Sequence, residues 1–188
     1  MKVTIPTPSF EQLYREARQV AIRVHGTSQP YDIFPYEKHL DDVVDVLKAF
    51  GLSGDYIIAG YLHDGMEDGP LSYNDIRKAF GIEAAEMVYC VTDELGRNRK
   101  EKKEKTLPKT KSNPKAIKIK LADRIANVRH SLRMAVTGGL SVDSDKMKMY
   151  KKEYPEFRSE LFDSAADDVT MAMWAMLDEI MEFKSQLV

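Results

Sequence analysis

The sequence predicts an all-α fold, on three observations. Apolar residues recur at helical spacing in several separate windows, residues that start and stop helices stand at the ends of these windows, and no two runs form a convincing pair of strands. An amphipathic helix has one apolar stripe to bury, so several such helices in one chain must pack against one another. We therefore expect a compact helical bundle.

Four helices are expected before residue 92. The first has an i, i+3, i+4, i+7 stripe and ends at Phe50-Gly51, and Ser53 can cap the second. The third starts at Ser72, which Asp75 follows, and ends at Phe80-Gly81. The apolar positions of the first, second and fourth helices are, in order, Leu40, Val43, Val44 and Leu47; Ile57, Ile58, Tyr61 and Leu62; and Met87, Val88 and Val91.

Two further helices are expected after residue 112. Asn113 can cap the first, and Pro114 then takes the first helical position, where its missing N–H costs nothing. The opening of this helix, residues 116–121, also alternates as a strand would. Gly138-Gly139 breaks the chain before the last helix. The apolar positions of the two helices are Ile117, Leu121, Ile125, Val128 and Leu132, and then Val169, Met173, Leu177 and Ile180.

Composition restricts the class of protein. With 43% hydrophobic and 31% charged residues, a chain of 188 residues can bury a substantial core and is typical of a soluble globular protein. The single cysteine, Cys90, cannot form a disulfide within the chain, which fits a reducing compartment. No stretch has the apolar length of a signal peptide or a membrane span, so we expect a cytoplasmic protein without a membrane partner.

Charge is unevenly distributed behind the formal net charge of -2. Residues 97–120 contain 11 Lys and Arg residues against only Glu101 and Glu104. Such a segment suggests an anionic partner, either a phosphorylated small molecule or nucleic acid, and it is also compatible with a solubilising loop. The segment has no aromatic residue on which bases could stack, so nucleic acid is the less favoured partner.

Two histidines and two aspartates have the chemistry of metal ligands. One histidine begins the first expected helix and a His-Asp pair ends the second, so an antiparallel connection could bring them within reach. Imidazoles with carboxylates suit Mn, Fe or Zn better than Ca. By itself a His-Asp pair is more often a surface feature than a site. The four candidates are His39, His63, Asp64 and Asp123.

Two further carboxylates follow the His-Asp pair. Glu67 lies four residues after His63, and Asp68 lies four residues after Asp64. At helical spacing these pairs share a neighbourhood. A carboxylate beside a metal site can accept a proton from the attacking water or orient it.

The arrangement resembles the HD-domain metal-dependent phosphohydrolases, whose signature is a His, a later His-Asp pair and a distant Asp. It is most similar to the hydrolase domain of the RelA/SpoT group and its small stand-alone relatives, which remove the 3′-pyrophosphate from (p)ppGpp. The resemblance covers about residues 14–132, and it implies one HD domain over residues 1–188 with C-terminal helices in 140–188. The matching stretches are PYEKH (35–39), AGYLHDGMED (59–68), IRKAFG (76–81), VTD (91–93) and KLADRIAN (120–127).

The resemblance implies a role for each matching residue. The four candidate ligands would hold one divalent transition metal ion, usually Mn in this group, with Fe or Zn as alternatives. Glu67 and Asp68 would handle the attacking water, and Asn127 would contact the substrate. To these we add Lys120, one turn before Asp123, as a phosphate contact, on the basis of its spacing and charge.

The substrate site departs from the family pattern. Related hydrolases commonly carry an arginine-rich segment after an early histidine, here His25, whereas residues 26–34 contain no basic residue. Arg97, Arg99 and Lys100 could replace that function. We therefore expect a nucleotide substrate of the ppGpp class. The alternatives are another phosphate ester, such as a nucleoside monophosphate or NADPH, and, less favoured, a noncatalytic nucleic-acid-binding protein.

Overall fold

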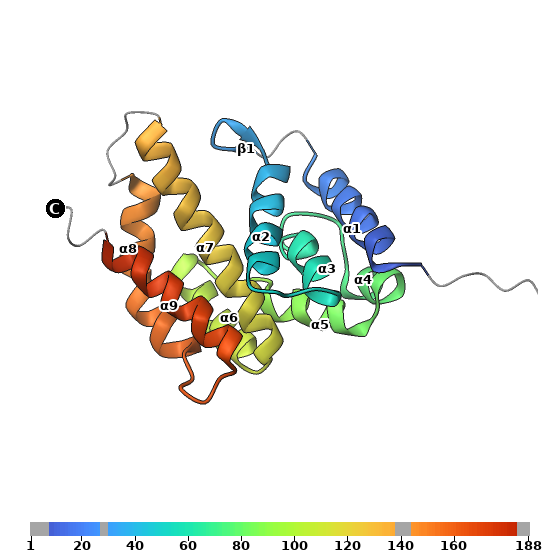
Figure 1. Cartoon of the computed structure of the whole chain (residues 1–188). Helices are drawn as coiled ribbons and strands as arrows, with labels where there is room; N and C mark the ends of the chain where they lie inside the picture. Colours follow the sequence, from blue (N-terminus) through green and yellow to red (C-terminus); the bar gives the residue numbers. More distant parts are fainter. Residues whose placement is uncertain (1–7, 27–29, 138–143, 184–188) are drawn as a thin grey trace, which may run out of the picture.

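Nine helices and one short hairpin form the part of the chain that the computed structural model describes, residues 8–26, 30–137 and 144–183 (Figure 1). The all-α expectation is confirmed, and the hairpin is its one exception among these residues. The helices are α1 (Phe10–His25), α2 (Glu37–Ala49), α3 (Asp55–Leu62), α4 (Tyr73–Phe80), α5 (Ile82–Val91), α6 (Arg99–Lys111), α7 (Pro114–Thr137), α8 (Asp145–Leu161) and α9 (Asp168–Phe183); strands β1 (Pro30–Tyr31) and β2 (Phe34–Pro35) pair antiparallel.

Helix α7 is the central element of the bundle. It contacts α2, α3 and α5, and also α6, α8 and α9. Figure 1 shows α8 and α9 on one side of α7 and α1 to α3 on the other. The buried part of α7 includes apolar residues and also the charged side chains of Lys118, Lys120 and Arg124. A buried charge needs a partner, so these side chains mark the polar sites inside the bundle.

Close approach of α2 and α3 depends on Gly60. A Cβ atom at this position would lie 2.6 Å from Leu47 Cδ1 and 3.2 Å from Val44 Cγ2, which is closer than carbon atoms pack. Glycine therefore lets the two helices approach over their apolar faces. The same contact brings the start of α2 next to the end of α3.

Most of the expected helix boundaries agree with the structure. Asn113 caps α7, since its Oδ1 accepts from the backbone N–H groups of Lys115 (3.0 Å) and Ala116 (3.3 Å). Residues 116–121 are helical, which removes the strand alternative. The expected cap at Ser53 is wrong: Gly54, with a φ of 63°, precedes α3 without a side-chain cap, and its N–H donates to the Tyr14 hydroxyl. The expected break at Gly138-Gly139 lies outside the described residues.

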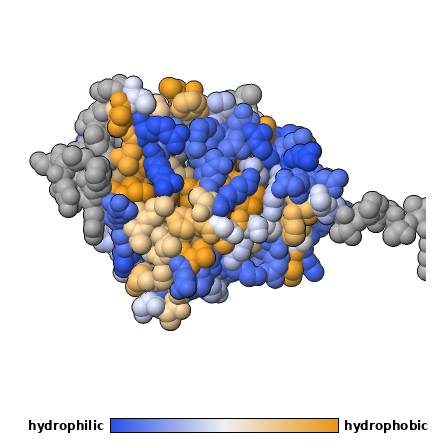
Figure 2. All heavy atoms as spheres, viewed as in Figure 1, coloured by the Kyte–Doolittle hydropathy of each residue, from blue (hydrophilic) through white to orange (hydrophobic). Residues whose placement is uncertain are grey.

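Hydrophilic and apolar side chains occupy different parts of the molecular surface. On the face shown in Figure 2, hydrophilic side chains cover most of the region of α1 to α3, and apolar ones gather where α9 crosses the view. No helix in the described part of the chain has the length and apolar character needed to cross a membrane.

Candidate metal centre

Three of the expected ligands meet inside the bundle. His39 lies in the first turn of α2, His63 directly follows α3, and Asp123 is on α7. One donor atom of each lies within 4.8 Å of the other two. The two Nε2 atoms are 3.2 Å apart, and Asp123 Oδ1 lies 3.4 Å from that of His39 and 3.8 Å from that of His63. Both imidazoles are buried, so three donors converge on one enclosed point.

The fourth expected ligand, Asp64, adjoins this group without belonging to the mutually close set. Its Oδ2 lies 3.0 Å from His63 Nε2 and 3.6 Å from His39 Nε2. The hydroxyl of Tyr36 donates a hydrogen bond to the same oxygen. The structure therefore brings all four expected ligands together.

A second layer of contacts orients these side chains. The Gly60 carbonyl lies 2.9 Å from His63 Nδ1. Since a carbonyl can only accept, Nδ1 carries the proton in the neutral ring and the Nε2 lone pair faces the cluster. The Asn127 amide donates to Asp123 Oδ1 at 2.5 Å, and its own oxygen accepts from the Tyr31 hydroxyl at 3.3 Å. Asn127 thus fixes a candidate ligand, a contact that the sequence did not suggest.

The charges in this cluster of His39, His63, Asp64 and Asp123 favour a cation between the two carboxylates. Burial would lower the pKa of His39 and His63, but the carboxylates of Asp123 and Asp64 outweigh it, and the pKa of His39 rises to about 9. Burial would raise the pKa of both aspartates, but the imidazoles outweigh it and lower them. Positive charge between these carboxylates is therefore favoured. A divalent ion would supply that charge in place of the imidazole protons.

Glu67 and Asp68 lie on a turn beyond α3, not on the helix that their spacing suggested, because α3 ends at Leu62. The turn keeps a helical hydrogen bond, from the Asp68 N–H to the Asp64 carbonyl at 2.9 Å. Both side chains line the cavity that contains His39 and Asp123. Partial burial, with Asp93 and Asp64 nearby, raises the pKa of Glu67. This carboxyl is therefore a better proton acceptor than an ordinary glutamate.

Cationic side chains line the same cavity, which has a volume of about 280 Å³. Lys120 is buried, donates to the Val91 carbonyl at 3.1 Å and lies 3.9 Å from Asp93 Oδ1. Lys103 donates to both oxygens of Asp93, at 2.8 and 2.9 Å. Arg99, Arg124 and Lys146 are the other cations in its lining. The candidate ligands and the other carboxylates thus share one cavity with several cations, a lining that could hold both a metal ion and an anionic group.

Two of the five expected substrate residues lie elsewhere. Arg97 and Lys100 do not line this cavity. The Arg97 side chain is 89% exposed and pairs with Glu101, and that of Lys100 is 76% exposed and lies 3.7 Å from Glu104. Conversely, Lys103 and Arg124 were not predicted. The excess of basic residues in 97–120 includes Lys103 without singling it out, and Arg124 lies outside that segment.

Comparison with known proteins identifies the fold family. The model of the HD domain family matches residues 17–150. This chain belongs to the HD domain family. The four candidate ligands are therefore the candidate metal centre of an HD domain, and the expected fold and family are both confirmed.

Two curated relatives of the chain are enzymes named for the same activity. The chain is 31% identical over 127 residues to guanosine-3′,5′-bis(diphosphate) 3′-pyrophosphohydrolase of Aquifex aeolicus, covering 65% of this chain and 18% of that protein. It is 30% identical over 122 residues to the enzyme MESH1 of Drosophila melanogaster, which carries the same activity name, covering 63% and 68%. The chain thus spans less than a fifth of the first relative and about two thirds of the second.

Solved structures support the HD fold independently. One, reported for a metazoan ortholog of SpoT that hydrolyses ppGpp, superposes with a TM-score of 0.71 at 22% identity, over 97% of this chain and 98% of that one. Another, lmo0812 from Listeria monocytogenes, superposes with a TM-score of 0.58 at 22% identity, over 82% and 99%. At these identities the similarity shows a shared fold.

Proposed function

We propose that the protein is a metal-dependent phosphohydrolase that removes the 3′-pyrophosphate from guanosine polyphosphates of the ppGpp class. The observation that carries the proposal is one cavity in which His39, Asp64 and Asp123 face the cations Lys103 and Lys120. The activity for which the two curated relatives are named supports the same reaction.

The donor set fits a divalent transition metal. His39 and His63 offer neutral nitrogens, and Asp64 and Asp123 offer charged oxygens. We propose Mn as the ion, with Fe or Zn as alternatives, because mixed nitrogen and oxygen ligands suit these metals. When bound, such an ion lowers the pKa of a coordinated water and withdraws charge from a phosphate oxygen.

The side chains around the ligands can complete the reaction. Glu67 accepts a proton from the attacking water, and Asp68 orients that water. The water oxygen forms a bond to the phosphorus attached to the 3′-oxygen, and the bond between this phosphorus and the 3′-oxygen breaks. The 3′-oxygen leaves and takes up a proton, so ppGpp yields GDP and pyrophosphate. Lys120 and Lys103 offset the charge of the diphosphate, and one N–H of Asn127 is left for the sugar or phosphate.

The test is a product analysis with the purified protein and added Mn. Guanosine 3′,5′-bis(diphosphate), NADPH and guanosine monophosphate are incubated separately, and products are resolved by anion-exchange chromatography. We expect GDP and intact pyrophosphate from the first substrate. Orthophosphate from NADPH or from the monophosphate, with the first substrate intact, would move the function to another phosphate ester. A His63→Ala, Asp64→Ala preparation controls for contaminating phosphatases.

A further inference from the structure

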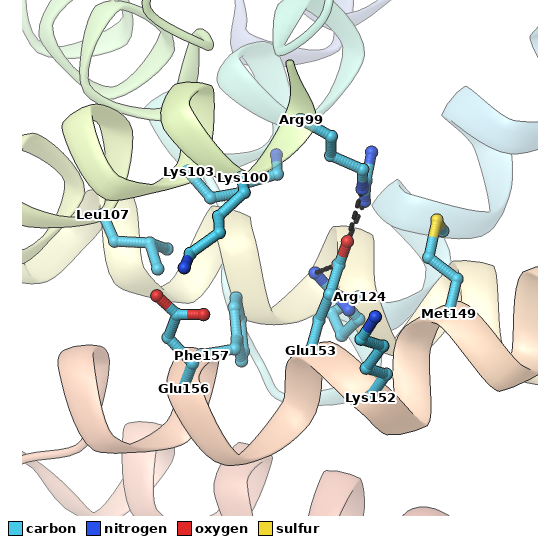
Figure 3. Close-up of a pocket in the computed structure, with 10 residues that line it drawn as sticks. All are labelled: Arg99, Lys100, Lys103, Leu107, Arg124, Met149, Lys152, Glu153, Glu156 and Phe157. Atoms are coloured by element: carbon cyan, nitrogen blue, oxygen red, sulfur yellow. Dashed lines mark hydrogen bonds and ion pairs between the residues drawn. The ribbon is translucent and has the colours of Figure 1, made fainter. Parts of the chain in front are cut away.

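A second cavity, of about 290 Å³, lies between α6 and α8 (Figure 3). It shares Arg99, Lys103 and Arg124 with the metal-site cavity, so the two adjoin. Leu107 and Phe157, both buried, contribute an apolar wall. The two cavities therefore meet at these three cationic side chains.

The lining of the second cavity is predominantly cationic. Five basic residues line it, against Glu153 and Glu156. Of these two acids, Glu153 is already paired with Arg99 and, at 3.4 Å, with Arg124. Two of the basic residues are exposed lysines that reach the cavity from different helices, as Figure 3 shows. They are Lys100 of α6 and Lys152 of α8. Positive charge beside an apolar wall suits an anionic ligand with a less polar body.

Arg124 is an incompletely bonded cation at the junction of the two cavities. Only 5% of the residue is exposed, and its guanidinium lies 4.7 Å from the ring centroids of both Tyr150 and Phe157. Nη2 donates to Glu153, whereas Nη1 is buried without a hydrogen-bond partner among the described residues. A buried charged donor without a partner is costly, and negative charge brought into the adjoining cavities would offset that cost electrostatically.

We propose that this second cavity binds the 5′-phosphate chain of the nucleotide whose 3′-diphosphate lies at the metal ligands. The proposal rests on the proposed function, because it requires a substrate with an anionic group at each end of one ribose. The 3′ and 5′ substituents leave the sugar ring in different directions, so adjoining cavities can take one each. Three cations line both cavities and would lie between the 3′ and 5′ substituents of the nucleotide. They are Arg99, Lys103 and Arg124.

The test removes two charges that belong to the second cavity alone. A Lys100→Gln, Lys152→Gln variant is compared with a Lys111→Gln, Lys148→Gln control, which changes the same two helices by the same charge outside both cavities. Each is assayed on guanosine 3′,5′-bis(diphosphate) and on guanosine 3′-diphosphate with a free 5′-hydroxyl. Two exposed charge contacts correspond to a rise in KM of about three- to tenfold.

We expect this rise only for the cavity variant and only with the 5′-phosphorylated substrate, with kcat unchanged. An equal rise with both substrates would reflect general electrostatic attraction and would overturn the proposal. An unchanged KM would overturn it as well.

A binding measurement separates this inference from the proposed function. GDP carries the 5′ chain without the 3′-diphosphate, and its Kd can be measured by calorimetry even if the protein hydrolyses no ppGpp. We expect the Kd to rise in the cavity variant and not in the control. Absent GDP binding, or binding that the cavity variant leaves unchanged, would overturn the proposal. So would noncompetitive inhibition of ppGpp hydrolysis by GDP, which would identify a separate effector site.

Discussion

Asp64 is the candidate ligand that accepts a hydrogen bond from a tyrosine, Tyr36. The ring of Tyr36 lies 4.3 Å from that of His25 and 5.3 Å from that of His39. Burial, with the negative charge of Asp64, raises the pKa of the Tyr36 phenol, so the hydroxyl remains a donor. Tyr36 can therefore orient a candidate ligand without carrying charge itself, as outer-shell groups at metal sites commonly do.

Replacing Tyr36 tests this role. We expect Tyr36→Phe to lower metal affinity by about 10- to 100-fold, the usual effect of losing an outer-shell hydrogen bond, while its ring contacts keep the fold intact. Affinity is measured by competition with a chromogenic chelator. Tyr73→Phe is the matched control, because it removes a tyrosine–carboxylate hydrogen bond, to Glu86, away from the cavity. Equal affinities in wild type and Tyr36→Phe would show that Asp64 does not depend on this hydroxyl.

The cavity carboxylates should separate metal binding from chemistry. Glu67→Gln and Asp68→Asn keep the shape of each side chain but remove its proton-accepting charge. We expect metal content to be retained and turnover to fall by about 10²- to 10⁴-fold, the typical contribution of a general acid or base. The readouts are elemental analysis and initial rates, with Glu86→Gln as a carboxylate control outside the cavity. Wild-type rates in both variants would exclude these carboxylates from the reaction.

The sequence predicted four residues that the structure brings together, His39, His63, Asp64 and Asp123, but only part of the cationic side of the cavity, namely Lys120 and Arg99. A His-Asp pair is by itself more often a surface feature, and it was the order and spacing of the HD-family stretches that made His39 and His63 identifiable in the sequence. Arg124 could not be identified in this way, because its importance depends on contacts with Glu153 and with the ring of Phe157, on another helix. Such contacts leave no periodic signal along the chain.

Helix α6 is an element that the sequence did not predict. The sequence predicted a basic segment there and named a solubilising loop as one interpretation, whereas residues 99–111 are helical. Only Thr106, Leu107 and Thr110 of this helix are buried, so it has no apolar stripe to detect. Pairs at i and i+4 stabilise it instead, with Glu101 accepting from Arg97 at 2.9 Å and from Lys105 at 3.0 Å.

The cap of α7 offers a stability test at this scale, because α7 carries Lys120, Asp123 and Asn127. Asn113→Ala removes the acceptor for two backbone N–H groups and should lower the free energy of unfolding by about 1 kcal/mol. Urea denaturation measures the change, with the exposed Lys111→Ala as control. Metal affinity should remain that of the wild type, because the candidate ligand Asp123 lies more than two helical turns after the start of α7. An unchanged unfolding free energy would mean that Pro114 and packing alone fix the start of α7.

Across the whole molecule, the basic segment is largely neutralised by the acidic body. Lys103 pairs with Asp93, Arg99 with Glu153, and Lys118 with Asp167 at 2.6 Å. Lys118 and Lys120 are buried, so the segment does not present all its charges to solvent. A nucleic-acid-binding face needs clustered, accessible cations. The arrangement instead favours a small anion that binds inside the bundle. It agrees with the sequence analysis, in which nucleic acid was the less favoured partner.

The candidate metal centre joins α2, the end of α3 and α7, so an ion bound there should stabilise the whole fold. A ligand at about a hundred times its Kd contributes about 2.7 kcal/mol to the native state. For a chain of this size, about 2–4 °C of Tm corresponds to each kcal/mol, so Mn should raise Tm by about 5–10 °C. Thermal unfolding is followed by circular dichroism after chelation and after adding Mn back.

The His63→Ala, Asp64→Ala variant decides whether the increase comes from this centre. It removes one nitrogen and one oxygen donor, so we expect no increase with Mn and no metal retained on elemental analysis. Wild-type protein given Ca should show a smaller increase than with Mn, because Ca prefers a set of oxygen ligands that His39 and His63 do not provide. An equal increase with Mn in the variant would place the ion elsewhere, and the assignment of these four ligands would then be wrong.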